Sequence, residues 1–323
     1  MTYRCRICES EGAWHSYIVR EMMLGTGDPF LYFQCGRCQC LQISEIPGKI
    51  DRYYPRDYYS YAATSRDRTG NPAMQWIRRM RNRASVVKNG PGSIIRNIFP
   101  NRKLLPLLQL GITPYSRILD VGCGSGWRLY ALRDAGFTKT LGVDPFVADD
   151  ITYENGLQIL KRTVQEIDGE WDVIMFHHSF EHIPDQIGTL RSAARRLCPG
   201  GTCLIRVPTV SSFAWEHYRE HWYQIDAPRH YYLHSLQSME LLARQAGMSV
   251  QSIVYDSTVD QFRGSELLRS GVPLVQGGKF PREQVREWKK KAHQLNLERR
   301  GDQVAFYLQK EGNDSIEKGS IQV

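Results

Sequence analysis

No part of the 323-residue sequence is a run of about 20 apolar residues, the length that a helix needs to cross a bilayer. The first residues, MTYRCRIC, also lack the apolar core of a secretory signal peptide. We therefore expect a cytoplasmic location, where thiols stay reduced and paired cysteines indicate metal binding rather than disulfide bonds. The length and a hydrophobic content of 41% allow a sizeable core and favour two folded units over one.

Acidic residues are scarce in the first third of the chain. Residues 1–110 contain 17 Lys and Arg against 8 Asp and Glu, whereas residues 111–323 contain 25 against 26. The formal net charge of +8 therefore comes from the N-terminal part alone. Its densest stretch interleaves arginines with apolar side chains: Met74, Trp76, Ile77, Arg78, Arg79, Met80, Arg81 and Arg83. Such a stretch suits a nucleic acid, an anionic membrane surface or a phosphate-bearing substrate, or it is a solvated helix face.

Four of the eight cysteines form two Cys-x-x-Cys pairs separated by 26 residues: Cys5, Cys8, Cys35 and Cys38. Two residues between thiols let both bind one ion, and two such turns complete a tetrahedral zinc site. Residues 14–19 and 30–34 are expected to form the two-stranded ribbon between the turns, and Cys40 is an alternative ligand. Four thiolates leave no open coordination position, so this zinc would be structural and would stabilise a small module. The alternative is a set of free cysteines without metal.

Residues 118–126, ILDVGCGSG, combine a short apolar run, an acid and three alternating glycines. This pattern predicts a buried parallel strand that enters a tight turn, where the backbone can approach a ligand. The next residues, WRLYALRDA, have helical spacing, and TLGV predicts a second strand that ends at Asp144. An acid at that place can accept hydrogen bonds from both hydroxyls of a ribose. Dinucleotide-binding folds share these features, although they typically carry GxGxxG at the first turn.

Two later segments distinguish the alternatives. A third strand, WDVIMF, is followed by HHSFEHIPD, and LCPGG precedes a further strand, TCLIRV. As a set, LDVGCGSG, LGVDP, WDVIMFHHSFEHIPD and LCPGG closely resemble the class I S-adenosylmethionine-dependent methyltransferases over roughly residues 112–255. The resemblance implies an α/β, Rossmann-like domain with a mostly parallel seven-stranded sheet and helices on both faces. It also implies that the glycine loop holds the methionine part of the cofactor, that Asp144 holds the ribose and that Val164 flanks the adenine. The cofactor-binding residues expected on this basis are Asp120, Gly122, Cys123, Gly124, Gly126, Asp144, Pro145, Val164 and His177.

The histidines after the third strand are the first candidates for the chemistry. Methyl transfer from a sulfonium is an in-line displacement, and a hydroxyl acceptor must also lose a proton. His178 and His182 follow a strand whose carboxyl end is expected at the pocket rim, and histidine titrates near neutrality. We predict His178 first as the catalytic base, with His182 and His177 as weaker candidates. In similar methyltransferases, however, the residues that correspond to Glu181 and His182 organise the loop without transferring a proton.

A second cluster, at about residues 210–235, is expected to form a lid over the acceptor. DAPRHYYLHSLQSMELLARQAGM resembles the D-x-P-x-H segment that many of these methyltransferases place over the substrate. Asp226 and His230 could act as a carboxylate-oriented base, and Arg229 could bind a phosphate or carboxylate. Tyr231 and Trp222 are further candidate substrate contacts. The alternative is that Asp226 and His230 only cap and orient the lid.

The expected organisation is a zinc ribbon (1–50), a Tyr-rich linker with a basic amphipathic helix (51–110), a methyltransferase domain (111–310) and a disordered tail (311–323). The ribbon, YYPRDYYSY, the basic helix and GDQVAFYLQK together resemble zinc-ribbon methyltransferases of bacterial surface-polysaccharide biosynthesis. That resemblance implies methylation of a hydroxyl on a sugar or sugar phosphate, with a sugar, nucleotide-sugar or lipid-linked glycan as acceptor. It also agrees with contact between the basic helix and the inner face of the membrane.

Three other functions stay open. A zinc module also precedes this fold in some ribosomal RNA guanine methyltransferases, although HHSFEHIPD lacks an Asn-Pro-Pro-Tyr-like element. A sugar C-methyltransferase is a second alternative, but similar enzymes usually carry a further C-terminal domain. The third is a non-catalytic zinc-ribbon scaffold, which the intact glycine loop and Asp144 do not favour.

Overall fold

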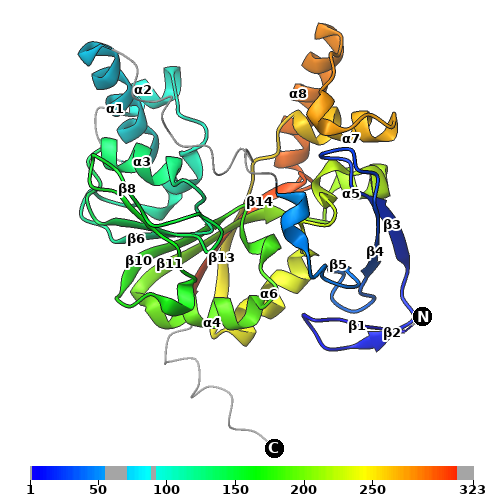
Figure 1. Ribbon diagram of the computed structural model, residues 1–323. Coiled ribbons are helices and arrows are strands. Elements are labelled where there is room, and N and C mark those ends of the chain that lie inside the picture. Colours follow the sequence, from blue (N-terminus) through cyan, green and yellow to red (C-terminus); the bar gives the residue numbers. More distant parts are fainter. Residues whose placement is uncertain (1, 55–70, 89–91, 311–323) are drawn as a thin grey trace, which may run out of the picture. The chain divides into compact units, whose positions relative to one another are not determined.

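The structure is a computed structural model that describes residues 2–54, 71–88 and 92–310 (Figure 1). Most of the YYPRDYYSY linker and the tail 311–323 lie outside the described residues. The chain forms two compact units. The ribbon unit comprises residues 2–54, 180–190 and 205–308, and the Rossmann unit comprises residues 71–179, 191–204 and 309–310. Within the described ranges, every helix is too short or too polar to cross a bilayer.

The sheet of the Rossmann unit is mostly parallel, as expected, with the strand order β11-β10-β6-β7-β9-β8. Parallel pairs join β10 to β6, β6 to β7, and β7 to β9, whereas β8 runs antiparallel to β9 at the edge. Parallel strands covered on both faces are mostly apolar, and all four residues of β6 are buried, including the acid Asp120. The strands are β6 (Ile118–Val121), β7 (Thr140–Val143), β8 (Ile151–Thr152), β9 (Gln158–Leu160), β10 (Trp171–His177) and β11 (Leu197–Pro208).

The helices of the Rossmann unit begin and end where the sequence supplies caps. Asn71 accepts a hydrogen bond from the backbone N–H of Met74 at the start of α1, and Pro72 occupies its first turn. Gly126, at φ +75°, precedes α3, and Gly136, at φ +96°, follows its end. The helices are α1 (Pro72–Val86), α2 (Gly92–Ile98), η3 (Leu105–Leu110), α3 (Trp127–Asp134), η4 (Val164–Glu166) and α4 (Gln186–Arg196), which begins in the ribbon unit.

The ribbon unit contains a four-stranded antiparallel sheet in the order β12-β5-β4-β3. The expected ribbon strands are confirmed as β3 (Ser16–Arg20) and β4 (Pro29–Gln34), after a short hairpin of β1 (Tyr3–Arg4) and β2 (Glu11–Gly12). β5 (Leu41–Ile43) pairs with β12 (Tyr232–Leu233), which belongs to the expected lid. The ribbon and this lid segment therefore share one sheet, because a module of 50 residues buries too little surface alone.

The core of the ribbon unit is aromatic. Trp222 and Tyr32 are fully buried and Trp215 is 2% exposed, in one cluster with the ribbon cysteines. The segment expected to form the lid is therefore packed in the core of the ribbon unit. The remaining elements are η1 (Ile50–Tyr53), η5 (Phe180–His182), α5 (Phe213–Tyr218), η6 (Arg219–His221), η7 (Tyr223–Ile225), α6 (Leu236–Gln245), β13 (Met248–Tyr255), α7 (Asp260–Arg269), η8 (Leu274–Gln276), α8 (Arg282–Leu297) and β14 (Gln303–Lys310).

The strand order continues as β13-β14-β11 in the ribbon unit, which makes eight strands rather than the expected seven. The extra strand is β8, a two-residue edge strand that the sequence pattern did not indicate. β11 also begins earlier than expected, at Leu197, so the LCPGG segment lies within it, with Gly200 at φ +76°. The Rossmann-like fold class is confirmed despite these differences.

Candidate functional site

The glycine loop connects β6 to α3 in a left-handed backbone conformation. Gly122, Gly124 and Gly126 have φ values of +70°, +54° and +75°. A Cβ atom on Gly122 would lie 2.4 Å from Cβ of Ser179, and one on Gly126 would lie 2.4 Å from Cδ1 of Ile159. These two glycines are therefore required by packing within the protein, whatever ligand the loop binds.

Two buried acids flank this loop at neighbouring parallel strands. Asp120 lies in β6 and is 1% exposed, whereas Asp144 directly follows β7 and is 5% exposed. Asp144 accepts hydrogen bonds from the backbone N–H of Gly124 at 2.8 Å and of Phe146 at 2.9 Å. An ionised carboxylate has about four acceptor positions, so two remain for the hydroxyls of a ribose. The contacts of Asp144 fit the role that the sequence predicted for it.

Asp120 is held differently. Its Oδ2 lies 3.4 Å from Nη1 of the buried Arg128, and its Oδ1 accepts no hydrogen bond from the residues that the structure describes. Burial raises the pKa of Asp120 to about 6, although the charge of Arg128 acts in the opposite direction. A buried carboxylate oxygen without a donor suits a cationic ligand group, such as the ammonium of a methionine moiety. The residues therefore fit the expected cofactor, and no sequence motif indicated the contribution of Arg128.

The other expected cofactor residues surround this loop or follow the neighbouring strands. Val164 is buried at the start of η4, and Pro145 is exposed immediately after Asp144. Cys123 packs toward β7, because a Cβ on Gly142 would lie 2.5 Å from its Sγ. Burial raises the pKa of the Cys123 thiol, so this side chain stays neutral.

His177 ends β10, and His178 follows it with its ring centroid 5.1 Å away. His178 has a φ of +56°, a conformation that is uncommon outside glycine and occurs more often at functional sites. The hydroxyl of Ser179 donates to the carbonyl of Val121 at 2.6 Å, next to the first glycine of the loop. His178 is therefore one residue away from a direct contact with the end of β6.

The ribbon unit brings together Glu181, His182 and His230, whose potential ligand atoms all lie within 4.8 Å of one another. Burial raises the pKa of Glu181 to about 8 and lowers that of His182 to about 3. Burial also lowers the pKa of His230. Both histidines are neutral at pH 7 and are weak bases, which does not fit a simple general-base role. The sequence predicts for Glu181 only a role in organising the loop, so its place beside two histidines comes from the structure alone.

The expected pair of Asp226 and His230 is not a hydrogen-bonded pair. Nε2 of His230 lies 3.8 Å from Oδ2 of Asp226, and its Nδ1 lies 2.7 Å from the carbonyl of Gln224. Asp226 instead accepts a hydrogen bond from Nε of Arg229 at 2.9 Å. Arg229 is fully buried and also lies 3.3 Å from Glu21. Its burial contradicts the prediction of a substrate contact, because two carboxylates of the chain already bind its guanidinium.

The other two predicted substrate residues are also interior. Trp222 is fully buried, and its Nε1 donates to Asp302 at 3.0 Å. Tyr231 is 6% exposed and its backbone N–H donates to the carbonyl of Glu181. The aromatic composition of this segment therefore reflects the core of the ribbon unit and not an exposed substrate surface.

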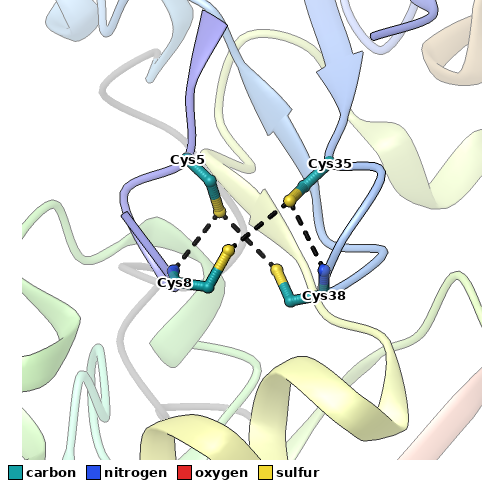
Figure 2. A group of neighbouring side chains, drawn as sticks. All are labelled: Cys5, Cys8, Cys35 and Cys38. Carbon is teal, nitrogen blue, oxygen red and sulfur yellow. Dashed lines mark hydrogen bonds between the residues drawn. The ribbon is translucent and has the colours of Figure 1, made fainter. Parts of the chain in front are cut away.

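The four predicted metal ligands converge, as Figure 2 shows for Cys5, Cys8, Cys35 and Cys38. Sulfur atoms lie 3.6 Å apart in the pairs Cys5–Cys38 and Cys8–Cys35. Ligands about 2.3 Å from a tetrahedral ion would be about 3.8 Å apart, so the spacing fits one. Cys40 is buried outside this group, with its Sγ 3.7 Å from the carbonyl of Leu41.

Comparisons with known proteins identify the family of the chain. A family model described as a methyltransferase domain matches residues 72–253, more than half of the chain. Ubiquinone biosynthesis O-methyltransferases of Escherichia coli O127:H6 and Shigella boydii serotype 18 are each 30% identical over 109 residues, 31% of this chain. The chain covers 45% of the length of these relatives, so it spans less than half of each.

Similar solved structures include the CcbJ methyltransferase from Streptomyces caelestis, at 11% identity and a TM-score of 0.39, covering 64% of this chain and 88% of that one. The cyclopropane synthase MmaA2 from Mycobacterium tuberculosis is 16% identical, with a TM-score of 0.42 and coverage of 64% and 82%.

Proposed function

The chain belongs to the methyltransferase-domain family. From this premise we propose that it is an S-adenosylmethionine-dependent methyltransferase, and we propose which residues hold the methyl donor. Asp120 would bind the ammonium of the methionine moiety, and Asp144 would bind the ribose hydroxyls. The observation that carries this proposal is the pair of buried carboxylates on adjacent parallel strands, with the left-handed glycine loop between them. Val164, Cys123, Pro145 and His177 would line the rest of the site.

Binding of S-adenosylhomocysteine, measured by isothermal titration calorimetry, tests this assignment. Asp144→Asn keeps the size of the side chain but removes its charge, and we expect affinity to fall about 10- to 100-fold, as for charge-assisted hydrogen bonds. Asp134→Asn, at the last residue of α3, is the matched control and should bind normally. Unchanged affinity in Asp144→Asn would refute the ribose contact.

For the acceptor, we propose a hydroxyl of a sugar or sugar phosphate in surface-glycan biosynthesis. Its oxygen would attack the methyl carbon in line with the methyl C–S bond, which breaks and releases S-adenosylhomocysteine, while the hydroxyl proton passes to a base. The resemblance of the ribbon, the Tyr-rich segment and the basic helix to such enzymes supports this class of substrate. His178 is the preferred base, because it follows the strand adjacent to β6 and the chain beside it contacts that strand. The low pKa of His182 makes it a weaker base at neutral pH.

Transfer of a labelled methyl group to separate acceptors tests the substrate class. The panel contains nucleotide sugars, lipid-linked glycans, ubiquinone precursors and total RNA, each with saturating cofactor. Label in the sugar-containing acceptors alone supports the proposal, and label in RNA or the quinone precursors alone overturns it. Cofactor binding without label in any acceptor would favour the scaffold alternative.

We propose that the four ribbon cysteines bind zinc, because thiolates in a tetrahedral arrangement suit this ion. Three groups donate to Cys5 Sγ: the backbone N–H of Ile7 and of Cys8, and the side-chain amide of Gln42. Such donors stabilise a thiolate. When bound, the ion would cross-link the hairpin of β1 and β2 to the turn between β4 and β5.

The basic helix is proposed to contact an anionic membrane surface. Residues 71–110 contain eight Lys and Arg and no Asp or Glu. Trp76, Ile77 and Met80 share one face of α1, because they are spaced three and four positions apart. Large apolar side chains are exposed across α1 and the region of α2: Met74 63%, Trp76 63%, Ile77 54%, Ile94 66%, Ile98 77% and Phe99 59%. Apolar side chains beside cations suit the interface of an anionic bilayer better than a nucleic acid.

Co-sedimentation with vesicles tests this contact. We expect binding to phosphatidylcholine vesicles that contain phosphatidylglycerol, and little binding to phosphatidylcholine alone. Trp76→Ser with Ile77→Ser should weaken binding at least about 10-fold, because two apolar side chains leave the interface. Tyr115→Ser removes a ring that is 79% exposed elsewhere in the same unit, and it should bind as the unchanged chain does. Equal binding by both variants would contradict the proposal.

A further inference from the structure

The cluster of Glu181, His182 and His230 in the ribbon unit has the composition of a metal site. One potential ligand atom from each residue lies within 4.8 Å of the other two. The residues come from two segments, η5 and the chain before β12, and the backbone N–H of Tyr231 joins them by donating to the carbonyl of Glu181 at 2.9 Å. Two imidazoles and one carboxylate are a donor set that suits divalent transition metals.

The hydrogen bonds of the two histidines determine which ring nitrogen is available. Nδ1 of His182 lies 2.9 Å from the carbonyl oxygen of Arg229, and Nδ1 of His230 lies 2.7 Å from that of Gln224. A carbonyl oxygen only accepts, so each Nδ1 carries the proton and each Nε2 keeps its lone pair. Metal-binding histidines are usually oriented in this way, with the second ring nitrogen donating to a carbonyl or carboxylate. Nε2 of His230 lies 3.9 Å from Oε1 of Glu181.

The charges around the cluster also favour a cation. Two buried acids, Glu21 and Glu181, and Asp226, whose side chain is 14% exposed, lie in this region with Arg229. Arg206 also acts on Glu181, but Arg206 is bound to a further carboxylate, Asp256, at 2.7 Å. A bound cation would displace the proton that burial keeps on Glu181. With Glu181 ionised in this way, the four acids and two arginines carry a net charge of −2. A divalent cation would balance that charge, which is costly to bury alone.

We propose that Glu181, His182 and His230 form a second metal site, distinct from the cysteine site, for a divalent cation that prefers nitrogen and oxygen ligands, such as Mn²⁺. Three protein ligands leave coordination positions open to an oxygen of another molecule. His182 is only half-buried, so this residue offers a path to solvent. The site lies within the ribbon unit and does not depend on the acceptor class proposed above.

Electron paramagnetic resonance of free Mn²⁺, titrated with zinc-loaded chain, tests the site. Mn²⁺ binds poorly to thiolates, so the cysteine site does not contribute to the signal. We expect about one bound Mn²⁺ per chain, and a loss of affinity of about 10-fold or more in Glu181→Gln and in His230→Gln. His217→Gln is the matched control, since this exposed histidine lies in α5 of the same unit and should leave binding intact.

Thermal unfolding of each variant, followed by circular dichroism with and without Mn²⁺, separates loss of the site from loss of the fold. A folded Glu181→Gln chain that no longer gains stability from Mn²⁺ supports the proposal. No binding by the unchanged chain at roughly millimolar Mn²⁺, or equal binding by all three variants, overturns it. S-adenosylhomocysteine affinity is measured on the same samples, so failure of the cofactor assignment is detected separately.

Discussion

Replacement of Arg229 by methionine should destabilise the ribbon unit strongly, because its buried guanidinium is the shared partner of the buried Glu21 and of Asp226, whose side chain is only 14% exposed. Its Nε donates to Asp226 at 2.9 Å, its Nη2 lies 3.3 Å from Glu21, and its Nη1 donates to the carbonyl of Tyr53 at 3.1 Å. Glu21 would remain satisfied, since four backbone N–H groups donate to it, from Met23, Leu24, Gly25 and Thr26. Asp226 would lose the charge that offsets its burial.

Removing one partner of a buried ion pair costs about 3–5 kcal/mol of unfolding free energy. We expect Arg229→Met to fall in this range at pH 7, in guanidinium unfolding followed by circular dichroism. Arg263→Met, on an exposed part of α7, is the control and should stay within about 0.5 kcal/mol. Adding Asp226→Asn to Arg229→Met should recover part of the loss, because it removes the buried carboxylate left without its cation.

The pH dependence provides a second check. Burial alone would raise the pKa of Asp226, but the charge and hydrogen bonds of Arg229 hold it below the ordinary value of 3.8. A lowered carboxyl pKa contributes stability above pH 4, which is lost as pH falls through the folded-state pKa. Without Arg229, burial raises this pKa instead, so the variant should lose more stability at pH 7 than at pH 4. A loss below about 1 kcal/mol at pH 7 would refute this account and would return Arg229 to consideration as a substrate contact.

Further expectations concern the donor site and the cysteines. Burial raises the pKa of Asp120 to about 6, so S-adenosylhomocysteine should bind more tightly at pH 7.5 than at pH 5.5, and its binding should release a proton. Both effects should vanish in Asp120→Asn. Calorimetry in two buffers of different ionisation enthalpy measures the affinity and the proton release. His178→Gly should raise the unfolding free energy by about 1 kcal/mol, because glycine adopts the left-handed backbone of this position without strain. The same variant should lower turnover about 100-fold or more, and full turnover would exclude His178 as the base. Gly126→Ala should destabilise the fold by about 2 kcal/mol or more, because its Cβ would lie 2.4 Å from Ile159; denaturant unfolding checks it. Cys38→Ser should lose bound zinc, measured by elemental analysis, whereas Cys40→Ser should retain it.

The local patterns predicted much of the Rossmann unit. Alternating glycines after an apolar run located the turn between β6 and α3, and each of these glycines has a positive φ. The spacing of the two Cys-x-x-Cys pairs likewise predicted four thiols around one point. Both are short-range signals, in which a residue type is tied to a backbone conformation or to the reach of a side chain.

The organisation of the ribbon unit was beyond such signals. The pairing of β5 with β12 joins residues nearly 200 positions apart, and no local pattern distinguishes an aromatic lid from an aromatic core. The same holds for Arg229, whose sequence context suits an anionic substrate as well as internal acids. Its partner Glu21 lies 208 positions away in the chain.

The sequence by itself determined the family and the residue types that we propose to hold the methyl donor and a zinc ion, because these depend on motifs of a few residues. Only the tertiary structure decided that Trp222 and Arg229 are interior, that Asp226 serves Arg229 rather than His230, and that Glu181 lies beside two histidines. Burial and charge compensation depend on contacts between distant segments. Those contacts form when the ribbon strands pair with the segment around β12.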